Sequence, residues 1–289
     1  VISGDTFRSR HAEVQEERAA GAFEIDRVVH GELIGDAESG FYLVRQEFPL
    51  AHRHGVTPLG SALDAHARHI AVWAADAELG AFDPRTAIFV DTETTGLMGG
   101  TGTVLFLVGV GHFTDDCFRL DQCFLRDYDD EEAMLAFLDE IFSRAETLVS
   151  YNGKTFDLPL LRTRFITNRV PFRLERAMHF DLVHAARRFW RKRLRDCSLG
   201  NVEREIMGIR RVGDVEGHLI PQLWLNYLRT RDARPLEPVF YHHKMDILSL
   251  VALTGLLSQK LETPDGRGFE HHEDRVSLLK LHFRQKNYE

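Results

Sequence analysis

The sequence has few cysteines, and they do not form a close pair. Cys117, Cys123 and Cys197 are the three in 289 residues. They give neither a Cys-x-x-Cys motif nor the even number that a disulfide framework needs. This usage fits a reducing compartment, so we expect a cytoplasmic protein.

Long hydrophobic runs are also missing. The longest nearly apolar run covers residues 247–257, which is too short to cross a bilayer. The N-terminus shows no signal-peptide pattern, and because the chain begins at Val1 without Met, we expect a processed or trimmed start. These absences predict no association with a membrane.

An excess of positive charge is the third absence. Lys and Arg number 36 against 44 Asp and Glu, for a net charge of −8. A protein that binds nucleic acid through overall basicity is therefore excluded, although a local basic path is not. The 44% hydrophobic content is that of an ordinary globular protein, and 289 residues predict one large domain with additions or two domains.

The order of the expected elements indicates an α/β fold. Residues 1–85 form an N-terminal extension of unknown role, with a helix expected over 13–20, a strand over 41–48 and a helix over 63–79. Residues 86–262 are richer in strands, which we expect over 87–90, 104–110, 118–124 and 147–151. Residues 263–289 begin with a Pro/Gly/Asp break and end in a helical segment, either the start of a helical repeat or a terminal helix that packs on the domain.

Two carboxylates follow the first strand of the central region. Asp91 and Glu93 come directly after the apolar residues 87–90. Residues i and i+2 of a strand point to the same side, so the two anions would repel each other beside a buried strand. Hard cations such as Mg²⁺ or Mn²⁺ would neutralise them. The alternative is a polar loop in which both side chains are solvated.

Further acids and a histidine stand beside helices later in the chain. Asp157 precedes a helix with Pro159 in its first turn, where it could equally be a simple N-cap. His242 and Asp246 are four residues apart and share one helical face, where they could equally be a hydrogen-bonded core pair.

Together these residues carry a resemblance to a known family. Asp91-x-Glu93, the block from Asn152 to Asp157 and His242-x-x-x-Asp246 resemble the three motifs of the DEDD (DnaQ-like) 3′–5′ exonucleases. Residues 89–97, 151–161, 179–184, 198–204 and 242–250 are closer still to the YprB-like branch of ribonuclease-H-like exonucleases. The resemblance implies a ribonuclease-H-like mixed β-sheet flanked by helices, with three antiparallel strands leading.

The resemblance also implies the site and its cofactor. Two Mg²⁺ or Mn²⁺ ions, roughly 3.5–4 Å apart, would be held by Asp91, Glu93, Asp157 and Asp246, with Asp91 bridging them. His242 would orient or deprotonate the attacking water. There are two departures from the branch. His243 stands where it usually has Asn, and the His-to-Asp separation of four matches the tyrosine-type spacing rather than the His-type spacing of five.

A basic stretch at residues 187–195 bears on the substrate. It places six cations around Phe189 and Trp190, and such cations neutralise phosphates while aromatic faces stack on unpaired bases. The alternative is a charged helix face whose aromatics belong to the core. Arg204, Arg210 and Arg211 could extend this path. The expected strand-binding residues are Thr92, Thr94, Asn152, Lys154, Phe156, Arg188, Trp190, Arg191, Lys192 and Arg193.

The interpretation is a metal-dependent 3′–5′ exonuclease on single-stranded nucleic acid, with DNA favoured over RNA although no feature addresses the 2′-hydroxyl. The polarity comes from the resemblance alone. Two alternatives remain, a structure-specific endonuclease and a non-catalytic nucleic-acid-binding module. His179 and Asp181 are expected at a strand end near the site, in supporting roles. In the last helix, Val276, Leu279 and Phe283 are expected to form the apolar face.

Overall fold

The architecture comes from a computed structural model, which describes residues 23–96, 102–262 and 270–286. The expected helix over residues 13–20 and the break at 263–268 lie outside the described residues. None of the described helices combines the length and apolar character that crossing a membrane requires.

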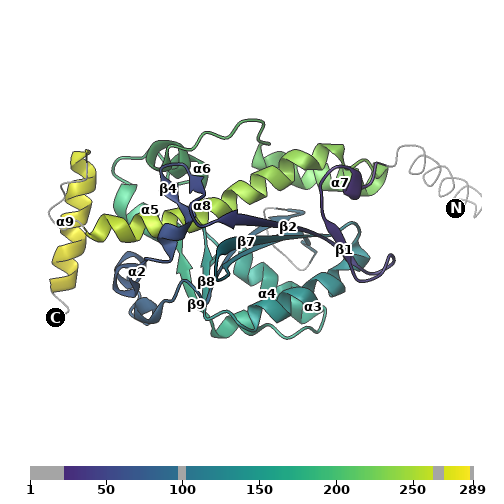
Figure 1. Cartoon of the computed structure of the whole chain (residues 1–289), viewed down its shortest axis with the longest axis horizontal. Coiled ribbons are helices and arrows are strands. Elements are labelled where there is room, and N and C mark those ends of the chain that lie inside the picture. The colour runs from purple at the N-terminus through teal and green to yellow at the C-terminus, as the bar shows by residue number, and fades with distance from the viewer. Residues whose placement is uncertain (1–22, 97–101, 263–269, 287–289) are drawn as a thin grey trace, which may run out of the picture.

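A mixed seven-stranded sheet forms the centre of the molecule (Figure 1). From one edge to the other its strands are β1 (Glu32–Ile34), β2 (Phe41–Pro49), β7 (Cys117–Phe124), β6 (Leu105–Phe113), β5 (Ala87–Thr94), β8 (Thr147–Ser150) and β9 (Met178–Asp181). Strands β5, β6 and β7 are consecutive and antiparallel, whereas β8 and β9 run parallel to β5. The expected α/β fold with three leading antiparallel strands is confirmed.

Helices cover both faces of the sheet because its strands are apolar on both sides. Helices α3 (Glu131–Phe142) and α4 (Asp157–Thr167) lie together below the sheet in Figure 1, and α8 (Glu237–Glu262) crosses above it. Along β5, Phe89 joins the core beneath α8, α5 (Leu182–Trp190) and α2 (Ala67–Ala74), while Ile88 and Val90 join the core with α3 and α4. Among the described residues, the remaining α-helices are α6 (Leu199–Val202), α7 (Ile220–Thr230) and α9 (His272–Lys286).

Helix α8 approaches the sheet closely at two glycines of β6. A Cβ on Gly109 would lie 2.1 Å from Ile247 Cδ1 and 2.4 Å from His243 Cε1, and one on Gly111 would lie 3.0 Å from Ile247 Cγ2. Gly109 pairs with Asp91 across the β5–β6 ladder. The missing side chains therefore let α8 settle beside the strand that carries the two carboxylates.

The N-terminal segment is built into this sheet. The expected strand over 41–48 is β2, and it pairs with β7 along eight residues. A two-stranded hairpin, β3 (Arg53–His54) with β4 (Thr57–Pro58), follows it. The helix expected over 63–79 is shorter: α2 covers Ala67–Ala74 and ends where Ala75 takes a left-handed conformation.

Helix α9 packs against α5, but not through the face that the sequence predicts. Leu278 and Leu281 are buried in the core shared with α5, whereas Leu279 and Phe283 are 56% and 70% exposed. The predicted apolar face is therefore wrong. Apolar residues occur on several sides of this helix, so periodicity alone did not select the buried one.

Candidate active site

Strand β5 carries Asp91 and Glu93 at its carboxyl end, beside β6 and β8. Burial raises the pKa of both carboxyls well above their usual range, and the nearby carboxylates of Asp246 and Asp157 raise it further. The two raised pKa values indicate that this environment disfavours the ionised form of both carboxyls unless positive charge is added. This agrees with the expected repulsion and not with a solvated polar loop.

Asp157 is the first residue of α4, and it is held by the strand that carries the other acids. Thr92 Oγ1 donates a hydrogen bond to Asp157 Oδ1 at 2.5 Å. Burial raises the pKa of Asp157 to about 6, although the Thr92 hydrogen bond opposes this shift. Phe156 is the N-cap residue of α4 and Asp157 is the first residue inside the helix, so the simple N-cap alternative does not account for the Asp157 side chain.

The loop before α4 is fixed by the end of β9. Asp181 accepts hydrogen bonds from the backbone N–H groups of Asn152 at 2.7 Å and Lys154 at 3.0 Å. His179 Nε2 lies 2.8 Å from Ser150 Oγ at the end of the neighbouring strand. The expected supporting positions of His179 and Asp181 are therefore confirmed, and the loop leaves the Asn152 and Lys154 side chains exposed.

Helix α8 brings His242 and Asp246 to the same cluster. They lie one helical turn apart, with His242 Nε2 3.4 Å from Asp246 Oδ2. The other ring nitrogen, Nδ1, lies 2.8 Å from Asp214 Oδ1. Glu93, His242 and Asp246 each offer one ligand atom, and these atoms lie within 4.8 Å of one another. A metal ion bound between these three atoms would contact His242 as well as the two carboxylates.

His243 points elsewhere, into the core, as the rotation of about 100° per helical residue predicts. Its side chain is 0% exposed. Gln122 Nε2 lies 3.0 Å from His243 Nδ1, and His243 Nε2 lies 3.1 Å from the backbone oxygen of Asp91. Burial lowers the pKa of His243 to about 4. A neutral ring that accepts from Gln122 and donates to Asp91 therefore joins α8 to β5.

Three residues at this site were not predicted as part of it. Arg211, expected on a basic path, is instead largely buried and binds Glu203 and Asp246. Glu203 enters the sequence prediction only within the resemblance over residues 198–204, and no motif points to Asp214. Their one sequence signal is a charged stretch after residue 203, which does not reveal that it folds back onto α8.

Several expected strand-binding residues have structural roles instead. Thr92 and Thr94 are buried, and their hydroxyls bind Asp157 and the backbone oxygen of Gly96. Trp190 is 0% exposed, so its indole belongs to the core and does not face a base. For the aromatics of this stretch, the core alternative is the correct one.

The cations of the same stretch divide into two groups. Arg188 donates to the backbone oxygen of Trp73, and Arg193 Nε lies 3.4 Å from Asp274 Oδ1. Arg191 and Lys192 are exposed. A cleft of about 400 Å³ between α5 and α9 is lined by Arg187, Arg188, Arg191, Lys192, Ser277, Lys280 and Leu281. No carboxylate is among these lining residues.

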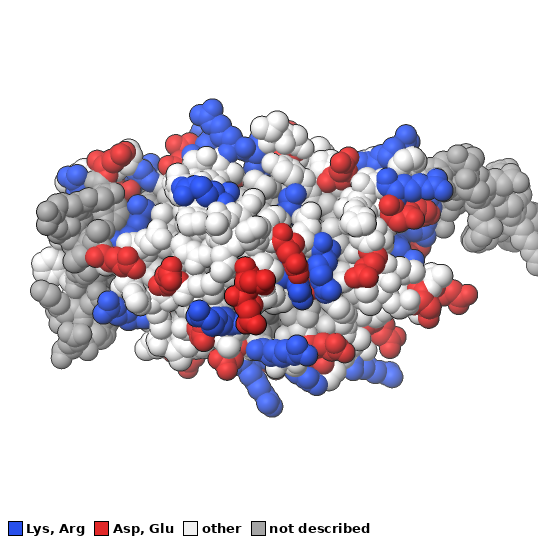
Figure 2. Space-filling model, in the orientation of Figure 1, with Lys and Arg blue, Asp and Glu red and all other residues white. Residues whose placement is uncertain are grey.

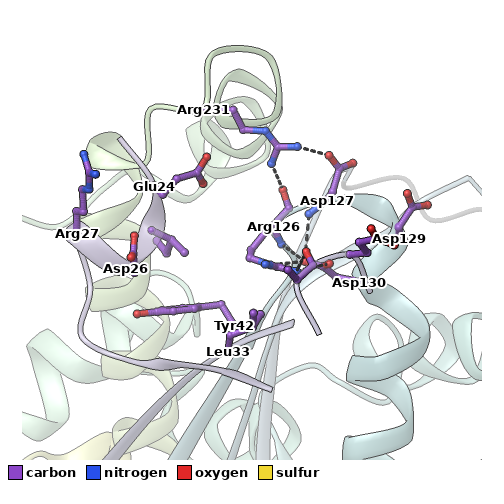
Figure 3. Close-up of a pocket in the computed structure, with 13 residues that line it drawn as sticks. Glu24, Asp26, Arg27, Leu33, Tyr42, Arg126, Asp127, Asp129, Asp130 and Arg231 are labelled. Atoms are coloured by element: carbon purple, nitrogen blue, oxygen red, sulfur yellow. Dashed lines mark hydrogen bonds and ion pairs between the residues drawn. The ribbon is translucent and has the colours of Figure 1, made fainter. Parts of the chain in front are cut away.

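A separate cavity of about 520 Å³ lies at the β1–β2 edge of the sheet, separated from β5 by β7 and β6 (Figure 3). Two of the three arginines that line it are paired: Arg126 binds Asp130 at 2.9 Å, and Arg231 binds Asp127. The cavity shares no lining residue with the acid cluster, so we do not assign it to the same chemistry.

The donor set of the acid cluster suits a hard divalent cation. Asp91, Glu93, Asp157 and Asp246 supply carboxylate oxygens, which Mg²⁺ and Mn²⁺ accept as ligands. Bound positive charge would offset the repulsion among these buried carboxylates. The structure thus brings together the four acids and the histidine that the sequence selects.

Comparisons with known proteins bear on the family of this chain. A family model described as the RNase H superfamily matches residues 88–258. The chain is 36% identical over 245 residues to the uncharacterized protein YprB of Bacillus subtilis (strain 168), covering 82% of this chain and 58% of that protein. It therefore spans little more than half of this curated relative. A family B DNA polymerase from the hyperthermophilic archaeon Pyrobaculum calidifontis aligns with a TM-score of 0.45 and 17% identity, covering 68% of this chain and 28% of the polymerase.

Proposed function

We propose, from the premise that this chain belongs to the RNase H superfamily, that it is a divalent-metal-dependent 3′–5′ exonuclease. Its substrate would be single-stranded nucleic acid, with DNA favoured over RNA. The observation that carries the proposal is the clustering of four carboxylates from β5, α4 and α8 beside His242. A protein that only bound nucleic acid would gain nothing from clustered anions near phosphates.

The acid cluster would hold two Mg²⁺ or Mn²⁺ ions through Asp91, Glu93, Asp157 and Asp246. Bound there, the ions would polarise the phosphodiester and offset charge on its oxygens. His242 is placed to take a proton at Nε2 from the attacking water, because its Nδ1 is occupied by Asp214. The Asp214 carboxylate would stabilise the imidazolium that results.

The nucleic-acid strand would follow exposed cations and polar side chains outside the acid cluster. Lys and Arg are interspersed with Asp and Glu over the face shown in Figure 2, so a basic path has to be local. We assign it to Asn152 and Lys154 in the loop before α4, and to the cleft between α5 and α9. There Lys280 lies against Lys192 and lowers the pKa of that ammonium group. A phosphate in the cleft would relieve the repulsion between the two.

End-labelled single-stranded DNA and RNA of the same sequence test this function, in time courses with Mg²⁺, Mn²⁺ or a chelator. We expect stepwise shortening from the 3′ end, faster for DNA, and no cleavage with chelator. A circular single strand should resist degradation. Cleavage of the circle would instead indicate an endonuclease, and binding without any cleavage would indicate a non-catalytic module.

Matched variants connect any cleavage to the acid cluster. Asp91→Asn removes one expected ligand with little change of shape and should abolish hydrolysis. Asp115→Asn makes the same chemical change at an exposed position in the β6–β7 turn and should retain full activity. Equal activity of the two variants would remove Asp91 from the mechanism.

A further inference from the structure

The guanidinium group of Arg211 lies inside the acid cluster, where a basic path on the surface would not place it. Its side chain is 10% exposed. It binds Asp246 Oδ1 through NH2, and its NH1 lies 3.4 Å from both Asp214 Oδ2 and His242 Nδ1. Arg211 therefore contacts an expected metal ligand, the expected base and the carboxylate that orients that base.

Glu203 anchors this arginine through two of its guanidinium nitrogens. Arg211 Nε and NH2 reach the two carboxylate oxygens of Glu203 at 2.8 and 2.5 Å, the paired geometry that fixes a guanidinium plane. Glu203 is 2% exposed and also accepts from Ser249 Oγ. Ser249 Oγ in turn lies 2.7 Å from Nε2 of the buried His54 in β3. The arginine is thus held by a buried network rather than by a mobile surface contact.

The position of Arg211 places a permanent charge where a divalent ion would act. The surrounding carboxylates raise the pKa of Arg211 despite the opposing effect of burial, so the guanidinium keeps its positive charge. One oxygen of Asp246 faces Arg211, and the other faces His242. A metal ion bound to Asp246 would therefore be repelled by the Arg211 guanidinium, which contacts the same carboxylate.

We propose that Arg211 is a resident counter-charge that preorganises Asp246 and His242 when no metal is bound and lowers the affinity of the cluster for divalent ions. It is a positioning residue, and its anchor is Glu203. The inference rests on the metal dependence proposed above. It predicts opposite changes in two measurable quantities, because the charge that stabilises the metal-free cluster opposes the metal.

Calorimetric titration of the full chain with Mn²⁺, together with thermal unfolding in chelator, tests the inference. Arg211→Gln should lower the unfolding temperature without metal and bind Mn²⁺ about tenfold more tightly. Arg211→Lys keeps the charge and should bind Mn²⁺ nearly as the parent does. Arg229→Gln removes the same charge from an exposed position on α7, outside the residues that line the pocket around Arg211, and should change neither quantity.

Arg211→Gln leaves the buried Glu203 carboxylate without its ion-pair partner. If Arg211→Gln does not fold, the double variant Glu203→Gln/Arg211→Gln takes its place. The double variant should show the same tighter binding of Mn²⁺ with a smaller loss of stability. If both variants bind Mn²⁺ with unchanged or weaker affinity, Arg211 is a purely structural residue. If neither the parent nor any variant binds Mn²⁺, the proposed metal-dependent function fails together with this inference.

Discussion

Replacing Asp157 by Asn should stabilise the metal-free protein at neutral pH while abolishing activity. Asn has nearly the same shape and keeps an oxygen that can accept the hydrogen bond from Thr92. It lacks the charge that the buried cluster disfavours. The pKa of Asp157 is about 6 in the folded protein against 3.8 for the free side chain, and a difference of this size corresponds to about 3 kcal/mol.

The sign follows from which state binds the proton more tightly. The folded pKa is the higher one, so the contribution of Asp157 to stability is fully present below pH 3.8 and is lost as pH rises through about 6. The Asn variant does not titrate. Its advantage over the parent should therefore be absent near pH 4, and should reach its full size above pH 7.

Thermal unfolding in chelator at pH 4, 5, 6 and 7.5 measures this difference. At pH 7.5 the variant should unfold on the order of 5 °C higher than the parent, and Mn²⁺ should stabilise the parent far more than the variant. Asp115→Asn, in the exposed β6–β7 turn, is the control and should follow the parent at every pH. A variant that is less stable than the parent at pH 7.5 would refute the electrostatic account of the cluster.

Three further predictions address the two histidines of α8, Gly109 of β6 and the exposed cations after α5. His242→Ala should slow the chemical step by about 100-fold or more, with a smaller effect on Mn²⁺ affinity. His243→Ala should lower the free energy of unfolding by about 2–4 kcal/mol, because it empties a buried, hydrogen-bonded position. If His243→Ala slowed the chemical step without loss of stability and His242→Ala did not, the two roles would be reversed. Gly109→Ala should cost about 1–3 kcal/mol in urea unfolding and lower kcat, since its Cβ would push α8 away from β5, and an unchanged kcat would contradict this. Arg191→Ala/Lys192→Ala should reduce the salt slope of single-strand binding by about 1.4 while turnover at saturation survives, and an unchanged slope would show that both cations are only solvated.

The parts of the site predicted from the sequence are those whose signal is local. Asp91 and Glu93 follow a buried strand directly, and Asp246 stands one turn after His242, so spacing alone places each pair on one side of its element. Their order along the chain then carries the resemblance. Assembly of the pairs into one cluster required the sheet, which the strand pattern over residues 87–150 also indicated.

The parts that could not be predicted depend on tertiary contacts. Arg211 and Arg191 both stand in charged stretches, yet one is buried against Glu203 and the other is exposed. Trp190 has the composition of a stacking residue beside cations, but the neighbouring elements bury it. Whether a side chain is buried depends on elements distant in the sequence. The local sequence therefore predicts what these residues could bind but not whether they are exposed.

The two halves of the acid cluster are made at different times during synthesis. His243, which joins α8 to the strand of Asp91, lies 152 residues after it. At roughly 5–20 residues per second, a ribosome needs about 8–30 s to cover that distance. During this interval the growing chain carries Asp91 and Glu93 without their partners from α8. The acid cluster can therefore assemble only after the residues of α8 up to Asp246 have been synthesised.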